Sequence, residues 1–123
     1  MYTIEEINDM LDEIAADLPE EIFHGLNGGV SLLSDTKKSE KDPSGSLYTL
    51  GEYRRDQMGR YILIYYGSLC AVYGKPSEKK MRKHLKNVLT HELTHHMESL
   101  AGERDLEIED EMEMDDYFSR KNS

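Results

Sequence analysis

The stretch between Pro76 and Gly102 contains neither glycine nor proline, and it constrains the fold more than any other part of the chain. Ser77 is suited to cap the start of a helix here, and Gly102 supplies a stop. Apolar residues recur in it at the spacings of a helix that packs one face on a core, namely Met81, Leu85, Val88 and Leu89. We therefore predict a long helix from Ser77 to about Ala101.

The first residues predict a second, shorter helix over residues 3 to 16. Thr3 and Glu6 have the spacing of a capping box, in which each side chain bonds the main chain of the other residue. Pro19 is suited to open a further short helix, which Gly25 would end. The apolar residues of the first helix fall on one face, namely Ile4, Ile7, Met10, Leu11 and Ile14.

The middle of the chain predicts β-structure. Val30 to Leu33 is a short strand candidate, and Leu47 to Tyr53 and Tyr61 to Tyr66 are rich in tyrosine and β-branched residues. The charged segment from Arg54 to Arg60 is expected to join the last two as a hairpin connection. Because residues 61 to 66 are continuously apolar or aromatic, we expect that strand to be covered on both faces. Ser34 to Ser46 is polar and contains proline and glycine, which predicts a mobile loop.

Together these elements predict an α+β fold, with a small twisted sheet of three or four strands packed on the long helix. A chain of 123 residues is expected to form one domain, residues 1–123, because a second core would leave each half too small. The strongly acidic residues 104–123 predict a weaker helix, from Leu106 to Phe118, and a tail. Cys70 is the single cysteine and is expected to be a small buried apolar group.

Charge and hydropathy exclude several classes of partner. A net charge of -10 argues against nucleic acid, since phosphate binding depends on clustered Lys and Arg. Basic residues gather between positions 75 and 86 and acidic ones between 103 and 116. We interpret them as the solvated faces of neighbouring helices, with a polyanion-binding face as the less favoured alternative. Without a secretion signal or an apolar run of about 18 residues, we expect a cytoplasmic protein with no membrane partner.

The long helix carries the sequence His91-Glu92-Leu93-Thr94-His95. Residues four apart project from one face of a helix, so two imidazoles about 6 Å apart at the backbone could share one tetrahedral zinc ion. Glu92 is rotated by about a hundred degrees from His91, which puts its carboxylate beside the metal instead of on it. Zinc would activate a water molecule for attack on a peptide carbonyl, and Glu92 would be the general base. The bland alternative is a solvated helix that carries two histidines and a glutamate by chance.

Three segments together resemble the small bacterial zincin-like metallopeptidase family. They are Leu18-Pro19-Glu20-Glu21, the aromatic strand region and His91-Glu92-Leu93-Thr94-His95-His96. The resemblance covers most of the chain, and only the helix motif is individually specific. It implies a minimal zincin fold, a zinc cofactor and a peptide or protein substrate held along an edge strand, which would be Leu47 to Tyr53 or Tyr61 to Tyr66.

The family motif continues as x-x-Gly-x-x-Asp, and the aspartate is taken as the third zinc ligand. Here Glu98 stands in the place of the glycine, and Gly-x-x-Asp follows one helical turn late, from Gly102 to Asp105. The family role maps best onto Asp105, although the chain would have to fold back sharply to bring it to zinc. Glu98 is expected to contact His95 from outside the metal shell or, less favoured, to be a ligand itself. Glu107 and Glu109 are further alternatives.

Other groups are assigned lesser parts. His84 is expected to be solvated, whereas His96 and His24 are expected to be structural or exposed. A tyrosine hydroxyl could assist the developing oxyanion, and the sequence does not choose among Tyr48, Tyr53, Tyr61, Tyr65 and Tyr66. Two rival functions remain open. One is a non-catalytic zinc-binding regulatory or interaction module on a zincin-like fold, and the other is a metal-free structural domain.

Overall fold

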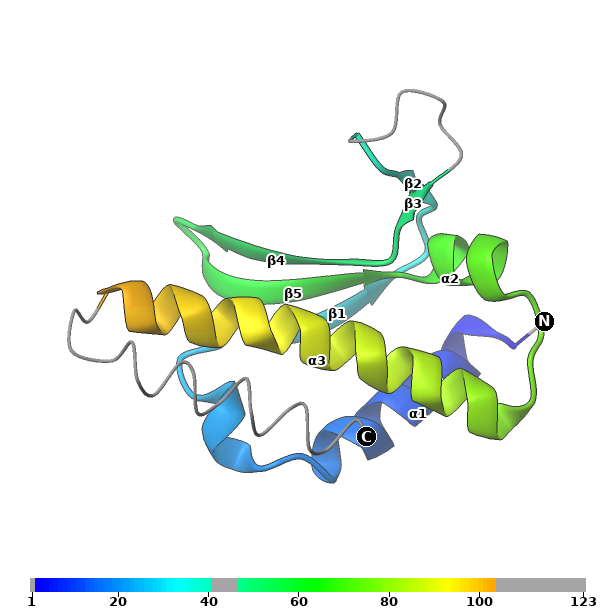
Figure 1. Cartoon of the computed structure of the whole chain (residues 1–123), viewed down its shortest axis with the longest axis horizontal. Helices are drawn as coiled ribbons and strands as arrows, with labels where there is room; N and C mark the ends of the chain where they lie inside the picture. Colours follow the sequence, from blue (N-terminus) through cyan, green and yellow to red (C-terminus); the bar gives the residue numbers. More distant parts are fainter. Residues whose placement is uncertain (1, 41–46, 104–123) are drawn as a thin grey trace.

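The computed structural model describes residues 2–40 and 47–103, which form an α+β fold. Its helices are α1 (Ile4–Ala16), the 3₁₀ helix η1 (Glu20–Phe23), α2 (Tyr66–Tyr73) and α3 (Glu78–Glu103). Its strands are β1 (Val30–Leu33), β2 (Lys37–Lys38), β3 (Tyr48–Thr49), β4 (Gly51–Asp56) and β5 (Gly59–Tyr65). The predicted fold class, a small sheet with a long helix, is thereby confirmed. Figure 1 shows α3 running across the molecule between the sheet and α1.

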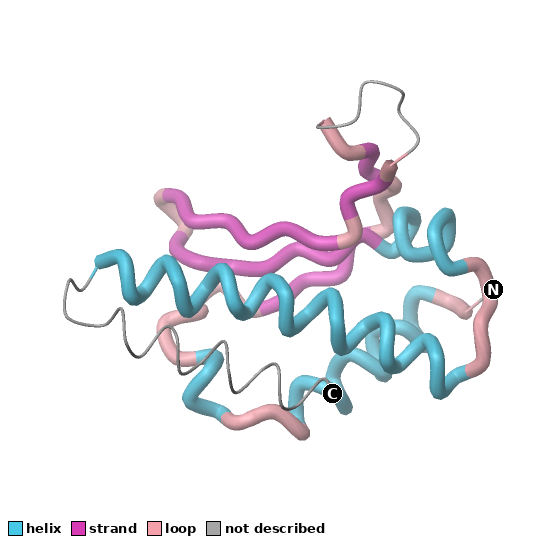
Figure 2. The backbone as a smooth tube through the Cα atoms, viewed as in Figure 1, coloured by secondary structure: helices cyan, strands magenta, loops and turns pink. Residues whose placement is uncertain are grey.

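The main sheet has three strands in the order β1-β5-β4, so that β4 and β1 are its edges. β1 runs parallel to β5, with Val30 opposite Ile62, and β4 runs antiparallel to β5, with Tyr53 also opposite Ile62. The short strands β2 and β3 pair separately as a projecting hairpin (Figure 2). The amide of Tyr65 bonds the carbonyl of Leu50. Since hydrogen-bonded pairs alternate along an antiparallel ladder, Gly51, Tyr53 and Arg55 point their main-chain groups away from β5.

α3 begins as predicted at Ser77, whose carbonyl oxygen accepts the Met81 amide and whose hydroxyl accepts the Lys80 amide at 3.3 Å. The helix continues to Glu103, slightly beyond the predicted end. Its buried face joins β4, β5 and α1 in one core, and the fully buried members on α3 include Leu85, Leu89 and Leu93. α1 has the predicted capping box of Thr3 and Glu6.

The β-region differs from the prediction in its turns. β4 extends through Asp56, so the hairpin connection is the two residues Gln57 and Met58 and not the whole segment from Arg54 to Arg60. The predicted strand from Leu47 to Tyr53 is broken at Leu50, between β3 and β4. The end of β4 was predicted as a connection because its residues are charged. Alternate residues of an edge strand face solvent, so charged side chains are compatible with a strand there.

The burial of β5 also differs from the prediction. Ile62 and Ile64 are fully buried beneath the helices, whereas Tyr61 and Leu63 point to the other face and are half-buried. The helices therefore cover one face of the sheet, and on the other face β5 is buried only at Tyr65, so the expectation of cover on both faces is confirmed only at that end of the strand. Within the predicted loop from Ser34 to Ser46, β2 forms a short ladder, and residues 41–46 lie outside the described residues.

Two further features were missed or misjudged. The segment after β5 forms α2, a helix that was not predicted because glycines such as Gly67 and Gly74 are typical of a connection. Gly67 is required there because a Cβ would lie 2.0 Å from the Thr36 hydroxyl oxygen. Cys70 on α2 is half-buried and not fully buried as expected. The predicted helix from Leu106 to Phe118 and the tail lie outside the described residues.

In the described part of the chain, no helix combines the length and the apolar character needed to cross a membrane.

Candidate functional site

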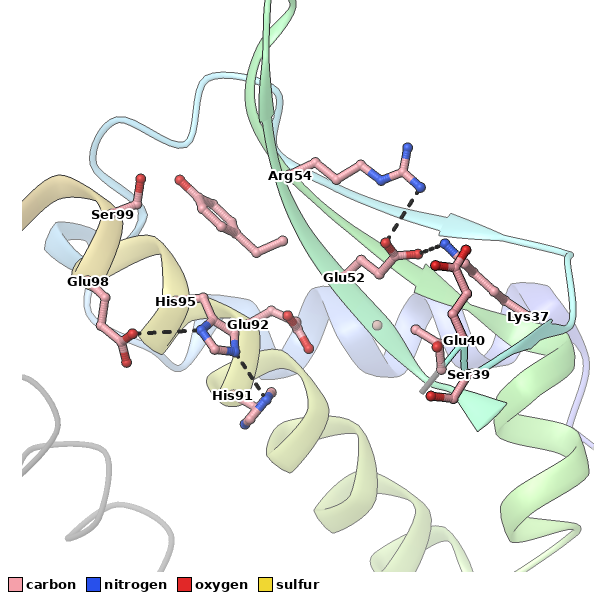
Figure 3. Close-up of a pocket in the computed structure, with 13 residues that line it drawn as sticks. Lys37, Ser39, Glu40, Glu52, Arg54, His91, Glu92, His95, Glu98 and Ser99 are labelled. Carbon is pink, nitrogen blue, oxygen red and sulfur yellow. Dashed lines mark hydrogen bonds and ion pairs between the residues drawn. The ribbon is translucent and has the colours of Figure 1, made fainter. Parts of the chain in front are cut away.

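The predicted ligands His91 and His95 lie side by side on the exposed face of α3. Their Nε2 atoms are 3.3 Å apart, and their rings meet edge to face with centroids 4.8 Å apart. Helical spacing explains the contact, since residues four apart occupy successive turns of one face. Figure 3 shows both rings at the mouth of a cleft.

The distance between the two nitrogens fits a shared metal ion. Zinc–nitrogen bonds of about 2.05 Å at the tetrahedral angle would put the two nitrogens about 3.3 Å apart. The observed 3.3 Å between the Nε2 atoms has that value without any change of side-chain conformation. The separation is therefore compatible with two ligands of one tetrahedral ion.

Glu98 contacts His95 from outside this pair. Its carboxylate lies 3.8 Å from Nδ1 of His95, one helical turn further along α3. A carboxylate on this side favours a hydrogen on Nδ1, which leaves the Nε2 lone pair free to bind a metal. This is the arrangement expected for a residue that orients a ligand.

The predicted general base, Glu92, points toward β4 and away from solvent. The residue is only 6% exposed. Burial raises the pKa of its carboxyl group, while the neighbouring His91 and His95 and the main-chain N–H of Tyr53 act in the opposite direction. A carboxylate with a raised pKa beside two neighbouring histidines has the properties expected of the predicted proton acceptor.

Gly51 on β4 makes room for this glutamate. A Cβ at position 51 would lie 3.3 Å from Cγ of Glu92 and 3.1 Å from Cγ1 of Val88. A larger residue would therefore push β4 away from α3 at the point where the carboxylate lies.

A cleft of about 970 Å³ runs past these residues and across the edge of β4. Figure 3 shows His91, His95 and Glu98 on one side of β4, with Lys37, Glu52 and Arg54 on the other. Glu52 pairs with the Lys37 ammonium, accepts the Tyr65 hydroxyl at 2.6 Å and lies 3.5 Å from Arg54. Burial acts to raise the pKa of Glu52, but the bonds from Lys37 and Tyr65 outweigh it, and the pKa is lowered.

The position of Lys37 is fixed through its main chain. The fully buried Ser68 on α2 accepts the Lys37 amide at 2.9 Å and donates its hydroxyl to the Lys37 carbonyl at 3.1 Å. The hairpin that forms this end of the cleft is thereby tied to α2.

The third ligand is not found in the described residues. Within residues 2–40 and 47–103, no three His, Cys, Asp or Glu side chains are grouped to hold a metal ion. The predicted ligand Asp105 and its alternatives Glu107 and Glu109 lie outside these ranges.

The remaining histidines lie apart from the His91–His95 contact, and His24 is exposed. His96 is fully buried, and its ring nitrogens contact the Tyr53 hydroxyl at 2.9 Å and the His24 carbonyl at 2.7 Å. Burial lowers the pKa of His96, which favours a neutral ring. His84, which we expected to be solvated, stacks on Tyr73 with ring centroids 3.9 Å apart.

Most of the tyrosines proposed as oxyanion donors are engaged elsewhere. The hydroxyl of Tyr53 contacts His96, that of Tyr61 donates to Asp56, that of Tyr65 donates to Glu52 and that of Tyr66 donates to the Tyr2 carbonyl. Tyr48 belongs to the projecting hairpin. None of these four tyrosines therefore has an unpaired hydroxyl directed at His91 and His95.

Sequence reasoning missed the contributions of Gly51, of the Tyr53 main chain and of Lys37 with Glu52. Each depends on strand pairing or on contacts between distant segments. A glycine followed by alternating residues at the start of a strand is the one local signal that could have marked position 51.

Comparison with known proteins bears on the fold. No protein-family model and no curated protein matches the chain. A solved structure of a conserved hypothetical protein from Thermus thermophilus is similar to it, with a TM-score of 0.69 and 29% sequence identity. The match covers 82% of this chain and 99% of that one. The two proteins thus share a fold over nearly the whole length of the Thermus thermophilus protein.

Proposed function

We propose that this protein is a zinc-dependent peptidase of the minimal zincin type, resembling the small bacterial zincin-like family. The observation that carries the proposal is the 3.3 Å separation of the His91 and His95 Nε2 atoms, with the buried Glu92 beside them. A hydrogen bond between the two rings would have the same separation, so the buried Glu92 beside the pair is what favours a hydrolytic metal site over two solvated histidines.

The chain's own residues would divide the work of hydrolysis. His91 and His95 hold zinc, which when bound lowers the pKa of a water molecule and polarises the peptide carbonyl. Glu92 accepts a proton from the attacking water and passes it to the leaving amine. Glu98 keeps the ring of His95 in the orientation that exposes Nε2.

The third ligand in this proposal is Asp105, which lies shortly after the last described residue of α3. Its assignment rests on the resemblance to the family motif. Glu107, Glu109 and Glu98 are the alternatives, and Glu98 is disfavoured because its carboxylate faces Nδ1 of His95 instead of Nε2.

The substrate class follows from the shape of the cleft. β4 is an edge strand, and the main-chain groups of Gly51 point away from β5 in the cleft that His91 and His95 also line. An extended peptide can add to such an edge through main-chain hydrogen bonds. A peptide or an extended protein segment is therefore the proposed substrate, and the lone cysteine favours a reducing, cytoplasmic setting.

A second candidate is a zinc-binding regulatory or interaction module that does not turn over peptides. It is favoured by Glu98 in the place of the family's glycine and by the lack of a third ligand among the described residues. The buried Glu92 with its raised pKa favours the peptidase, because a binding module needs no proton acceptor there.

Glu92→Gln tests the choice between enzyme and module. The variant keeps the size of the side chain but removes the proton acceptor, so hydrolysis of a mixed peptide library should fall at least about a hundredfold. Zinc content and thermal stability should stay close to those of the parent. Equal inertness of parent and variant would favour the binding module, and loss of zinc would make Glu92 a ligand.

A further inference from the structure

A chain of hydrogen bonds lies behind the metal-binding face of α3. Its central member, His96, follows His95 directly and is fully buried between α3 and β4. The Nε2 atom of His96 lies 2.7 Å from the carbonyl oxygen of His24, and Nδ1 lies 2.9 Å from the Tyr53 hydroxyl oxygen. The Tyr53 hydroxyl is also 3.2 Å from Nη1 of Arg60, which lies 2.6 Å from the Ser99 hydroxyl.

The direction of every bond in this chain is fixed by chemistry. A carbonyl oxygen only accepts, so Nε2 of His96 carries the hydrogen and Nδ1 of the neutral ring is an acceptor. The Tyr53 hydroxyl must therefore donate to Nδ1. Its lone pairs are left to accept a hydrogen from Arg60, because a guanidinium only donates. The bonds run from Arg60 through Tyr53 and His96 to His24 without a mismatch.

These bonds connect the elements that form the two sides of the site. Tyr53 belongs to the edge strand β4, and His96 and Ser99 belong to α3. Arg60 is in β5, and its main-chain groups are bonded to Asn27 and Gly28 in the connection after η1. The chain thus fixes the spacing between β4 and α3.

Tyr53 acts on the site from its main chain as well as from its hydroxyl. Its N–H points away from β5 and toward Glu92, whose carboxylate it contacts. A shift of β4 relative to α3 would move this donor away from the carboxylate. It would leave His91 and His95 in place, because both rings are carried by α3 itself.

We propose that Tyr53 and His96 are positioning residues that hold β4 against α3 and so keep the Glu92 carboxylate aligned for hydrolysis. This inference rests on the proposed peptidase function. It separates the residues that align the base from those that bind zinc. Loss of the Tyr53 hydroxyl should therefore lower turnover with little effect on zinc or on the KM for peptide.

The test compares Tyr53→Phe with Tyr61→Phe. Both remove one phenolic hydroxyl from the same sheet, but the Tyr61 hydroxyl bonds Asp56 on the face away from α3. In Tyr53→Phe, kcat on a peptide that the parent cleaves should fall about tenfold or more, with KM within about threefold and one zinc retained, as expected for a misaligned base. Tyr61→Phe should keep kcat within about twofold. An unchanged kcat in Tyr53→Phe, or an equal loss in both variants, would overturn the proposal.

Hydrogen exchange provides a second measurement that needs neither zinc nor a substrate. In zinc-free protein, the amides of residues 52–54 should exchange about tenfold faster in Tyr53→Phe than in the parent, because Nδ1 of His96 loses its buried partner. Exchange in Tyr61→Phe should match the parent. If the parent cleaves no peptide but these amides respond as expected, the peptidase proposal fails and the alignment of β4 by Tyr53 stands. Unaltered exchange in Tyr53→Phe would overturn the alignment itself.

Discussion

The two walls of the cleft are built in different ways. The α3 wall is local, because His91, Glu92 and His95 owe their relative positions to successive turns of one helix. The β4 wall is assembled from distant segments, since Gly51 and Tyr53 are placed by pairing with β5 and by contacts to α3. In the proposed peptidase, metal binding and alignment of the base would therefore have separate structural supports. Substitutions on one wall should leave the function of the other largely intact.

After the two histidines, the proposed third ligand, Asp105, should have the largest effect on zinc affinity. Asp105→Ala should weaken zinc binding by more than about a hundredfold, because it removes a direct ligand, whereas Glu98→Ala should cost about ten- to a hundredfold. Competition with a zinc chelator of known affinity measures both. The reverse order would move the third ligand to Glu98.

Ser68, which ties the hairpin at Lys37 to α2, should affect the stability of the fold and not its zinc content. Ser68→Ala removes the two hydrogen bonds between the buried Ser68 hydroxyl and the main chain of the half-buried Lys37, and it should lower the free energy of unfolding by about 1–3 kcal/mol. Ser31→Ala, at an exposed position of β1, is the matched control and should change it by less than about 0.5 kcal/mol. Urea unfolding measures both, and equal stabilities would contradict the anchoring role of Ser68.

Because β4 lies close to Glu92 at Gly51, a side chain at position 51 should lower the rate of hydrolysis. Gly51→Ala would crowd Glu92 and Val88, so hydrolysis should fall about tenfold while zinc content stays near that of the parent. Rates on one cleaved peptide, together with zinc analysis, provide the test. An alanine at position 51 that left the rate unchanged would show that this spacing does not matter.

The smallest expected effect is the pH dependence contributed by Glu52. The pKa of Glu52 is lowered, so its ion pair stabilises the fold fully above the ordinary value of 4.5 and is lost as the pH falls through the lowered pKa. Glu52→Gln should therefore be less stable than the parent by ~1 kcal/mol or less at pH 7, and the difference should shrink in acid. Urea midpoints at pH 7 and near pH 3 test this, and a difference that grew in acid would contradict it.

The features of the α3 wall could be predicted from the sequence, whereas those of the β4 wall could not. The extent of α3, the capping box at Thr3 and the contact of Glu98 with His95 depend on residues three or four apart, and helical periodicity predicts them. The pairing of Tyr53 with His96 joins residues 43 positions apart, which no local pattern indicates. The β4–β5 turn and α2 were missed because charged residues in an edge strand resemble a loop and two glycines resemble a connection.

The central claim is that His91 and His95 bind one zinc ion, and the most direct test is the zinc content of the purified parent and its histidine variants. The account predicts one tightly bound zinc per chain in the parent and none in His91→Ala or His95→Ala, because each variant removes a direct ligand. The control is His84→Ala, which alters another histidine of α3. His84 stacks on Tyr73 of α2, and its variant should retain the metal. A tightly bound zinc that persisted in either ligand variant, or a parent that bound none, would contradict the account.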